Sequence, residues 1–84
     1  MSPDDAAIRQ AILAVLAERT PGATACPSEA ARRLDPGNWR ALMPDVRRVA
    51  AAMVREGRIG ITQRGLAVDP ETARGPVRLG RGPG

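Results

Sequence analysis

Apolar residues near the start of the chain recur at the spacing of an α-helix. Ile8, Ile12, Val15 and Leu16 fall on one helical face. The residues before them, Ser2-Pro3-Asp4-Asp5, favour a helix start, with Ser2 as N-cap, a first-turn proline and two carboxylates at the positive helix end. Thr20-Pro21-Gly22 ends the pattern. We therefore expect a first helix that covers the core.

A second, shorter helix is predicted from Pro27 to Leu34. Its apolar side consists of Ala30, Ala31 and Leu34, and Asp35-Pro36-Gly37 ends it. The residues just before it, 23–26, are compatible with a short strand. The same stretch brings Cys26 to the start of the helix.

The third helical pattern contains a proline, and this predicts a break. An unbroken helix from Trp39 to Glu56 would make Pro44 clash with the carbonyl of Arg40. We expect a brief helical turn over 38–42 and a main helix that starts at Pro44 and ends at Gly57. The predicted buried side of the main helix consists of Val46, Val49, Ala50, Met53 and Val54. Its predicted outward side consists of Arg48, Ala51, Ala52 and Arg55.

Alternating apolar residues after the third helix predict a β-hairpin. Ile59 and Ile61 precede the turn Gln63-Arg64-Gly65, and Leu66 and Val68 follow it. Three helices followed by a hairpin are typical of a winged helix, an α+β fold that is mainly α. We assign residues 1–71 to this domain and 72–84 to a Gly/Pro/Arg-rich tail. Within the tail, 75–79 is expected to dock as an edge strand, leaving 80–84 free.

Composition limits the range of functions. The chain has 84 residues, fifteen of them alanine, so one small domain with a thin core is expected. Histidine, lysine, tyrosine and phenylalanine are absent, which argues against an enzyme, a metal site or a bound cofactor. The single Cys26 excludes an internal disulfide, and no apolar run is long enough for a membrane span. These features together predict a cytoplasmic protein.

Positive charge is concentrated in two parts of the chain. The net charge is +4 and all thirteen cations are arginine. Residues 28–64 carry +4 and those from 74 onward +3, whereas 1–27 carry −1 and 65–73 carry −2. Clustered arginines suit bidentate contacts with phosphate, although a GC-rich genome would also favour arginine without any functional reason.

Four arginines are the candidate contacts with DNA: Arg47, Arg48, Arg55 and Arg64. Arg48 and Arg55 lie two turns apart on one face of the third helix, and Arg64 lies at the tip of the hairpin. The alternative is a solvated face, in which Asp45 pairs with Arg48 and, on the second helix, Glu29 pairs with Arg32 or Arg33. The nine residues 35–43 make a longer connection than a compact helix-turn-helix uses. Trp39 lies in this connection and is expected to fill the core.

Several motifs in the expected order resemble a known family. They are CPSEAARRL (26–34), WRALMPDVRRVA (39–50), EGRIGITQRG (56–65), VDP (68–70) and GPVRL (75–79). The chain resembles the domain of unknown function 3253 family, small bacterial proteins assigned to the winged-helix superfamily. The resemblance implies a winged-helix fold and, by analogy, a nucleic-acid-binding ancestry, but it implies no substrate and no catalytic residue.

Three functions stay open at this point. The first is a DNA-binding winged helix. The second is a protein interaction module or homodimer, in which Ala51 and Ala52 pack against a partner helix. The third is a thiol sensor at Cys26, set against the simpler expectation that this cysteine is a small buried residue.

Overall fold

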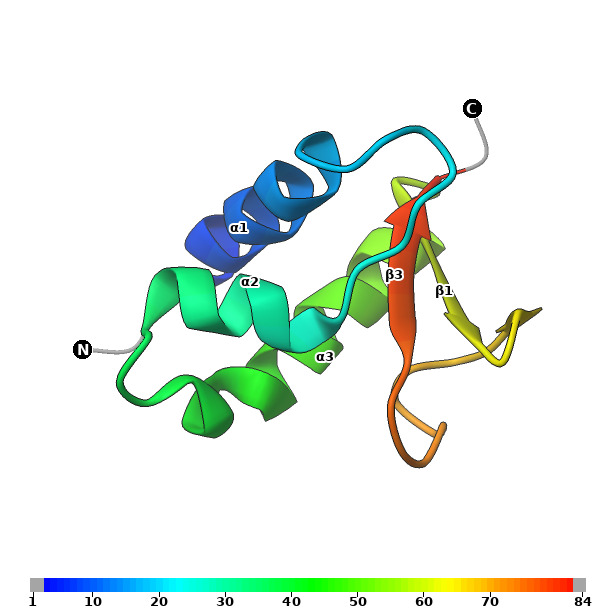
Figure 1. Cartoon of the computed structure of the whole chain (residues 1–84). Coiled ribbons are helices and arrows are strands. Elements are labelled where there is room, and N and C mark those ends of the chain that lie inside the picture. The colour runs from blue at the N-terminus through cyan, green and yellow to red at the C-terminus, as the bar shows by residue number, and fades with distance from the viewer. Residues whose placement is uncertain (1–2, 83–84) are drawn as a thin grey trace.

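Three helices pack together on one side of the molecule and a small sheet lies on the other (Figure 1). The computed structural model describes residues 3–82. The helices are α1 (Asp5–Ala17), α2 (Pro27–Leu34) and α3 (Trp39–Arg55), and the strands are β1 (Ile59–Gln63), β2 (Leu66–Ala67) and β3 (Arg78–Arg81). This mainly helical arrangement with an antiparallel sheet confirms the predicted α+β class and is consistent with a winged-helix-like fold.

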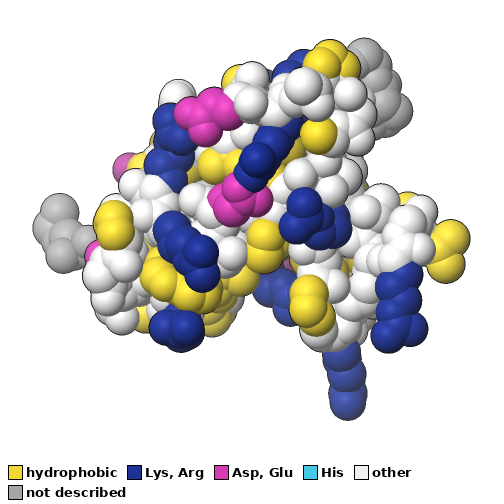
Figure 2. Space-filling view, in the orientation of Figure 1, with side chains coloured by type: hydrophobic (Ala, Val, Ile, Leu, Met, Phe, Trp, Pro, Cys, Tyr) yellow, Lys and Arg dark blue, Asp and Glu magenta, His cyan; other side chains and the backbone are white. Residues whose placement is uncertain are grey.

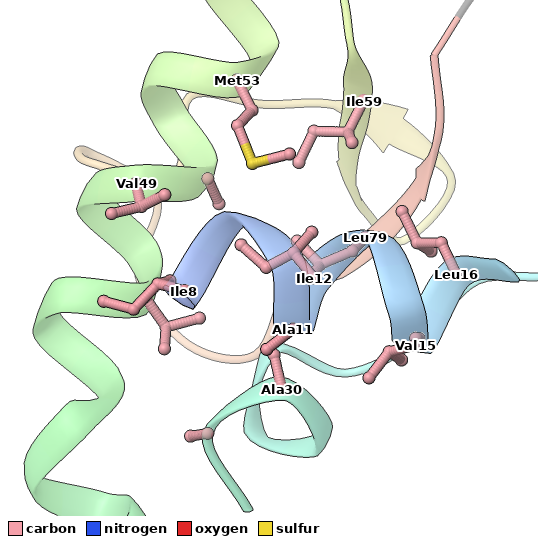
Figure 3. Close-up of a cluster of buried hydrophobic side chains, with 14 of the residues drawn as sticks. Ile8, Ala11, Ile12, Val15, Leu16, Ala30, Val49, Met53, Ile59 and Leu79 are labelled. Carbon is pink, nitrogen blue, oxygen red and sulfur yellow. The ribbon is translucent and has the colours of Figure 1, made fainter. Parts of the chain in front are cut away.

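The core is formed by the helical faces that the spacing of apolar residues predicts (Figure 3). Ile8 and Ile12 of α1 and Met53 of α3 are at most 1% exposed. Ile59 of β1 and Leu79 of β3 complete the same cluster from the sheet side. The predicted apolar sides of α1 and α3 are thus confirmed as the principal contacts between the layers.

The start of α1 differs from the prediction. Asp4 is the N-cap, and its carboxylate accepts a hydrogen bond of 2.8 Å from the amide of Ala7. Pro3 therefore precedes the helix, and Ser2, the predicted cap, lies outside the described residues. An aspartate at this position both satisfies a free amide and places negative charge at the positive helix end.

The predicted break in the third helix is wrong. α3 is continuous from Trp39 to Arg55 and contains Pro44, which leaves the carbonyl of Arg40 without its usual amide donor. Continuity extends the buried side by one turn, because Leu42, one turn before Val46, is only 6% exposed. We attribute the unbroken helix to this additional burial.

The end of α3 is as predicted. Gly57 has a φ of +75°, and its amide donates to the carbonyl of Val54 at 2.9 Å. The amide of Arg58 donates to the carbonyl of Met53, also at 2.9 Å. These two bonds form a Schellman motif, for which glycine is favoured because it has no Cβ. The motif turns the chain directly into β1.

The sheet contains the predicted hairpin, but the second strand of the hairpin is short. β2 has only two residues, pairs with the end of β1, and leaves Leu66 72% exposed. β1 pairs instead along its first four residues with β3, giving the strand order β2-β1-β3. Because four of its five residues pair with β3, β1 needs the end of the chain to complete its hydrogen bonding.

The C-terminal strand lies later than expected. It spans Arg78–Arg81 rather than 75–79, and on its other side Leu79 exchanges backbone hydrogen bonds of 2.7 and 2.8 Å with Ala25. Val77 and Leu79 are 2% and 0% exposed, so this segment belongs to the common core. Gly80 and Arg81, expected to be free, pair with β1. The predicted strand in 23–26 is this isolated bridge at Ala25.

Candidate nucleic-acid interface

Arg48 is held by two carboxylates. Its guanidinium donates to both oxygens of Asp5 at 2.8 and 3.0 Å, and one nitrogen also reaches Asp45 at 3.4 Å. Hydrogen bonding to Arg48 lowers the pKa of the Asp5 carboxyl below its ordinary value. The predicted Asp45 pair is present, but the bidentate bond to Asp5 of α1 is the shorter contact. Arg48 is therefore already neutralised on the surface where DNA contact was predicted.

Arg47 and Arg55 are both held by the loop between β2 and β3, which we call the β2–β3 loop (residues 68–77). Arg47 donates to the carbonyl of Gly75 at 2.7 Å, and Arg55 pairs with Glu71 at 2.6 Å. Ala51 lies between them, one turn from each, and is 2% exposed. The expectation that Ala51 faces outward is wrong, because this line of α3 is covered. The Ala51–Ala52 patch predicted as a protein contact is correspondingly reduced to the half-exposed Ala52.

Arg64 is exposed at the tip of the hairpin, as predicted. It has a φ of +54° and is followed by Gly65 at +82°, which are the two positive values that a tight type I′ turn requires. A positive φ costs a non-glycine residue about 1 kcal/mol or more. Of the four predicted contacts, Arg64 is the one whose side chain forms no hydrogen bond or ion pair within residues 3–82.

A cluster around Trp39 was missed by sequence reasoning. The guanidinium carbons of Arg32 and Arg40 lie 4.3 and 4.5 Å from the centre of the Trp39 ring, within cation–π range. Trp39 is half-buried and packs against the core rather than filling it. The cluster joins α2 to the first turn of α3, and no spacing within either helix signals it.

The ion pairs predicted for α2 are also replaced by others. Arg33 pairs with Glu18 at 2.8 Å, and Glu29 pairs with Arg19 and accepts the Cys26 amide at 2.8 Å. Arg32 therefore forms no ion pair among the described residues. Arg9 completes the paired set through a bidentate contact with Glu56 at 2.5 and 2.7 Å, which lowers the pKa of the Glu56 carboxyl.

The arginines thus divide into two groups. Five form ion pairs within residues 3–82: Arg9, Arg19, Arg33, Arg48 and Arg55. The other eight form no ion pair there. Arg47, Arg78 and Arg81 donate to uncharged oxygens instead, and Arg58 is exposed at the α3–β1 junction. The remaining four are exposed, and we call them the basic edge: Arg32, Arg40, Arg64 and Arg74.

In Figure 1, the elements that carry the basic edge run from the α2–α3 junction at the left, past the β2–β3 loop at the bottom, to the β1–β2 turn at the right. In the same orientation, Figure 2 shows dark-blue side chains along the lower side of the molecule, whereas the larger magenta patches lie higher.

An apolar groove opens beside the cluster around Trp39. It has a volume of about 420 Å³ and is lined by the start of α2, the first half of α3 and the end of the β2–β3 loop. Cys26 lies in it as a half-buried free thiol, with its sulfur accepting a hydrogen bond from the Ser28 hydroxyl at 3.1 Å. The simpler expectation of full burial for this cysteine is not met.

Within residues 3–82, no helix combines the length and apolar content that crossing a bilayer requires.

Comparison with known proteins gives one result on the family. A model of the DUF3253 family, described as proteins of unknown function, matches residues 5–82. The search of curated proteins finds no match. The matched region includes all three helices and all three strands, so the chain belongs to the DUF3253 family of proteins of unknown function.

Proposed function

We propose that the protein binds duplex DNA through its basic edge, in the cytoplasm and without catalysing a reaction. The observation that carries the proposal is the separation of the arginines, since the edge arginines form no ion pair among the described residues while Arg9, Arg48 and Arg55 do. A guanidinium that is not already neutralised is free to exchange counterions for phosphate.

Of the four arginines predicted from the sequence to contact DNA, only Arg64 belongs to the basic edge. Arg48 and Arg55 would have to give up Asp5 and Glu71 before meeting a phosphate, and these partners cancel their charge. Arg64 instead projects from a two-stranded ribbon beside the exposed Leu66, a geometry suited to a groove edge. Arg32 and Arg40 are oriented by the Trp39 ring, which reduces the entropy lost when they bind.

Phosphate contact predicts moderate, sequence-independent affinity. Four neutralised phosphates would give a slope of about −3.6 in a plot of log K against log salt concentration. Fluorescence anisotropy of a labelled random duplex of about one and a half turns, titrated at several salt concentrations, measures this slope directly.

The matched variants are Arg64→Gln on the basic edge and Arg58→Gln away from it. Both remove one exposed charge, and Arg58 lies at the α3–β1 junction. We expect Arg64→Gln to weaken binding about threefold to tenfold and to reduce the salt slope by about one, with Arg58→Gln close to the parent protein. No binding at low salt, or equal losses in both variants, would refute binding through this edge.

A further inference from the structure

The apolar groove beside α3 has the features of a site for a small molecule. Its volume of about 420 Å³ lies in the range of small-molecule sites, which is about 300–1,000 Å³. Trp39, Met43, Pro76 and Val77 give it apolar walls, and Arg47 contributes a cation. No carboxylate is among the residues that line it. The groove is thus apolar along its walls and positive at one point.

Arg47 has hydrogen-bonding capacity left over. One of its terminal nitrogens donates to the carbonyl of Gly75 at 2.7 Å, and its remaining N–H groups form no hydrogen bond within residues 3–82. Its side chain lies among the groove residues, and the residue is half-buried, so a bound anion would be partly shielded from water. Charge-assisted hydrogen bonds are strongest in such settings.

The surroundings add to the positive potential. Arg32 and Arg40 lie against the Trp39 ring, which itself lines the groove, and neither forms an ion pair among the described residues. A neutral apolar ligand would use the walls but leave this potential unused. A small inorganic anion would use the charge but leave the apolar walls exposed to water.

We propose that the groove binds small organic carboxylates with an apolar chain. The carboxylate of the ligand would bind Arg47, and its apolar chain would lie between Trp39, Met43 and Pro76. Ligand binding in this groove is a function separate from the proposed DNA binding and does not depend on it. Because the Arg47 bond to Gly75 ties the β2–β3 loop to α3, a ligand on Arg47 sits at the junction of these two elements.

Trp39 makes the test direct, because it is the single tryptophan and the chain has no tyrosine. The probes are sodium octanoate, 1-octanol with the same chain but no charge, and sodium butyrate with the same charge but a short chain. We expect octanoate to change Trp39 emission saturably, with a Kd at least about tenfold lower than that of either comparison compound.

Variants then test the role of Arg47. Arg47→Gln should weaken octanoate binding about tenfold or more, Arg47→Lys should retain part of it, and Arg58→Gln, outside the groove, should retain all of it. In the unmodified protein, the methyl NMR signal of Met43 should shift on binding, whereas that of Met53, which is 0% exposed, should shift less.

Three results would overturn the site. These are no saturable response below about 3 mM octanoate, equal binding of octanol and octanoate, or unchanged octanoate affinity in a folded Arg47→Gln variant. The methyl shifts decide the case if that variant does not fold, because a response at Met53 without one at Met43 would exclude the groove.

Discussion

At the scale of single residues, backbone conformation and charge pairing decide what each arginine can do. Arg64 occupies a positive φ that glycine or asparagine would adopt at lower cost. Arg48 faces two carboxylates, one of them from another helix. The sequence predicted that both arginines are exposed, but it could not predict that Asp5, 43 positions away, neutralises one of them.

The turn residue provides a test of stored strain. Arg64→Asn removes the side chain least suited to a φ of +54° while keeping the type I′ turn. We expect the free energy of unfolding to rise by about 0.5–1 kcal/mol, measured by urea denaturation. The same variant should bind DNA more weakly, and a loss of stability would contradict the turn geometry.

Gly82 provides a test of how the end of the chain docks. A Cβ at this position would lie 2.7 Å from the carbonyl oxygen of Gly57 and 2.8 Å from the backbone of Arg58. Gly82→Ala should therefore destabilise the protein by about 1–3 kcal/mol in thermal or urea unfolding.

Gly37→Ala is the matched control, since its nearest neighbour beyond the adjacent residues, the Asp35 carboxylate, would be 3.8 Å away. It should change stability by less than about 0.5 kcal/mol. An unaffected Gly82→Ala variant would mean that the end of the chain is free, as the sequence suggested.

At the scale of elements, periodicity predicted the faces of the helices and the presence of the hairpin, but not the main pairing of the sheet. The buried sides of α1 and α3 follow from local spacing, and Gly57 ends α3 where its lack of a Cβ favours it. The β1–β3 pairing joins segments separated by the whole β2–β3 loop, so local alternation favoured the nearer but shorter β2. The same loop binds Arg47 and Arg55, which lie one turn on either side of Ala51, and Ala51 is buried although helical spacing alone would place it at the surface.

The proline in α3 tests the continuity of that helix. Proline in a helix interior is about 3 kcal/mol less favourable than alanine, and the freer unfolded chain of the alanine variant offsets about 1 kcal/mol of this. Pro44 is exposed, so Pro44→Ala should stabilise the protein by about 1–2 kcal/mol in urea unfolding. A neutral or destabilising effect would instead favour a separate helix starting at Pro44.

At the scale of the whole molecule, ion pairs between α1 and α3 link stability to acidic pH. Hydrogen bonds to Arg48 and Arg9 lower the pKa values of Asp5 and Glu56 from ordinary values of 3.8 and 4.5. For carboxyls with a lowered folded pKa, the stabilisation is present above the unfolded values and is lost as pH falls through the folded values. The melting temperature should therefore begin to fall below about pH 4.5.

A double variant, Arg9→Gln with Arg48→Gln, serves as the comparison in circular dichroism melts. It should show a shallower fall in melting temperature below about pH 4.5 than the parent protein, because its carboxyls lose their partners. Equal slopes would show that these pairs contribute no pH-dependent stability. Both pairs are exposed, so added salt should reduce the difference.

DNA binding through the basic edge requires its unpaired arginines to contact phosphate, while Arg48 and Arg55 stay with their carboxylates. The most direct measurement compares two double variants of equal charge in the DNA-binding assay at low salt: Arg32→Gln with Arg40→Gln, and Arg48→Gln with Arg55→Gln. We predict that the first lowers affinity about tenfold or more, since it removes two phosphate contacts, and that the second changes it by less than about threefold. A large loss confined to the second variant would contradict this proposal and return DNA contact to Arg48 and Arg55 on α3.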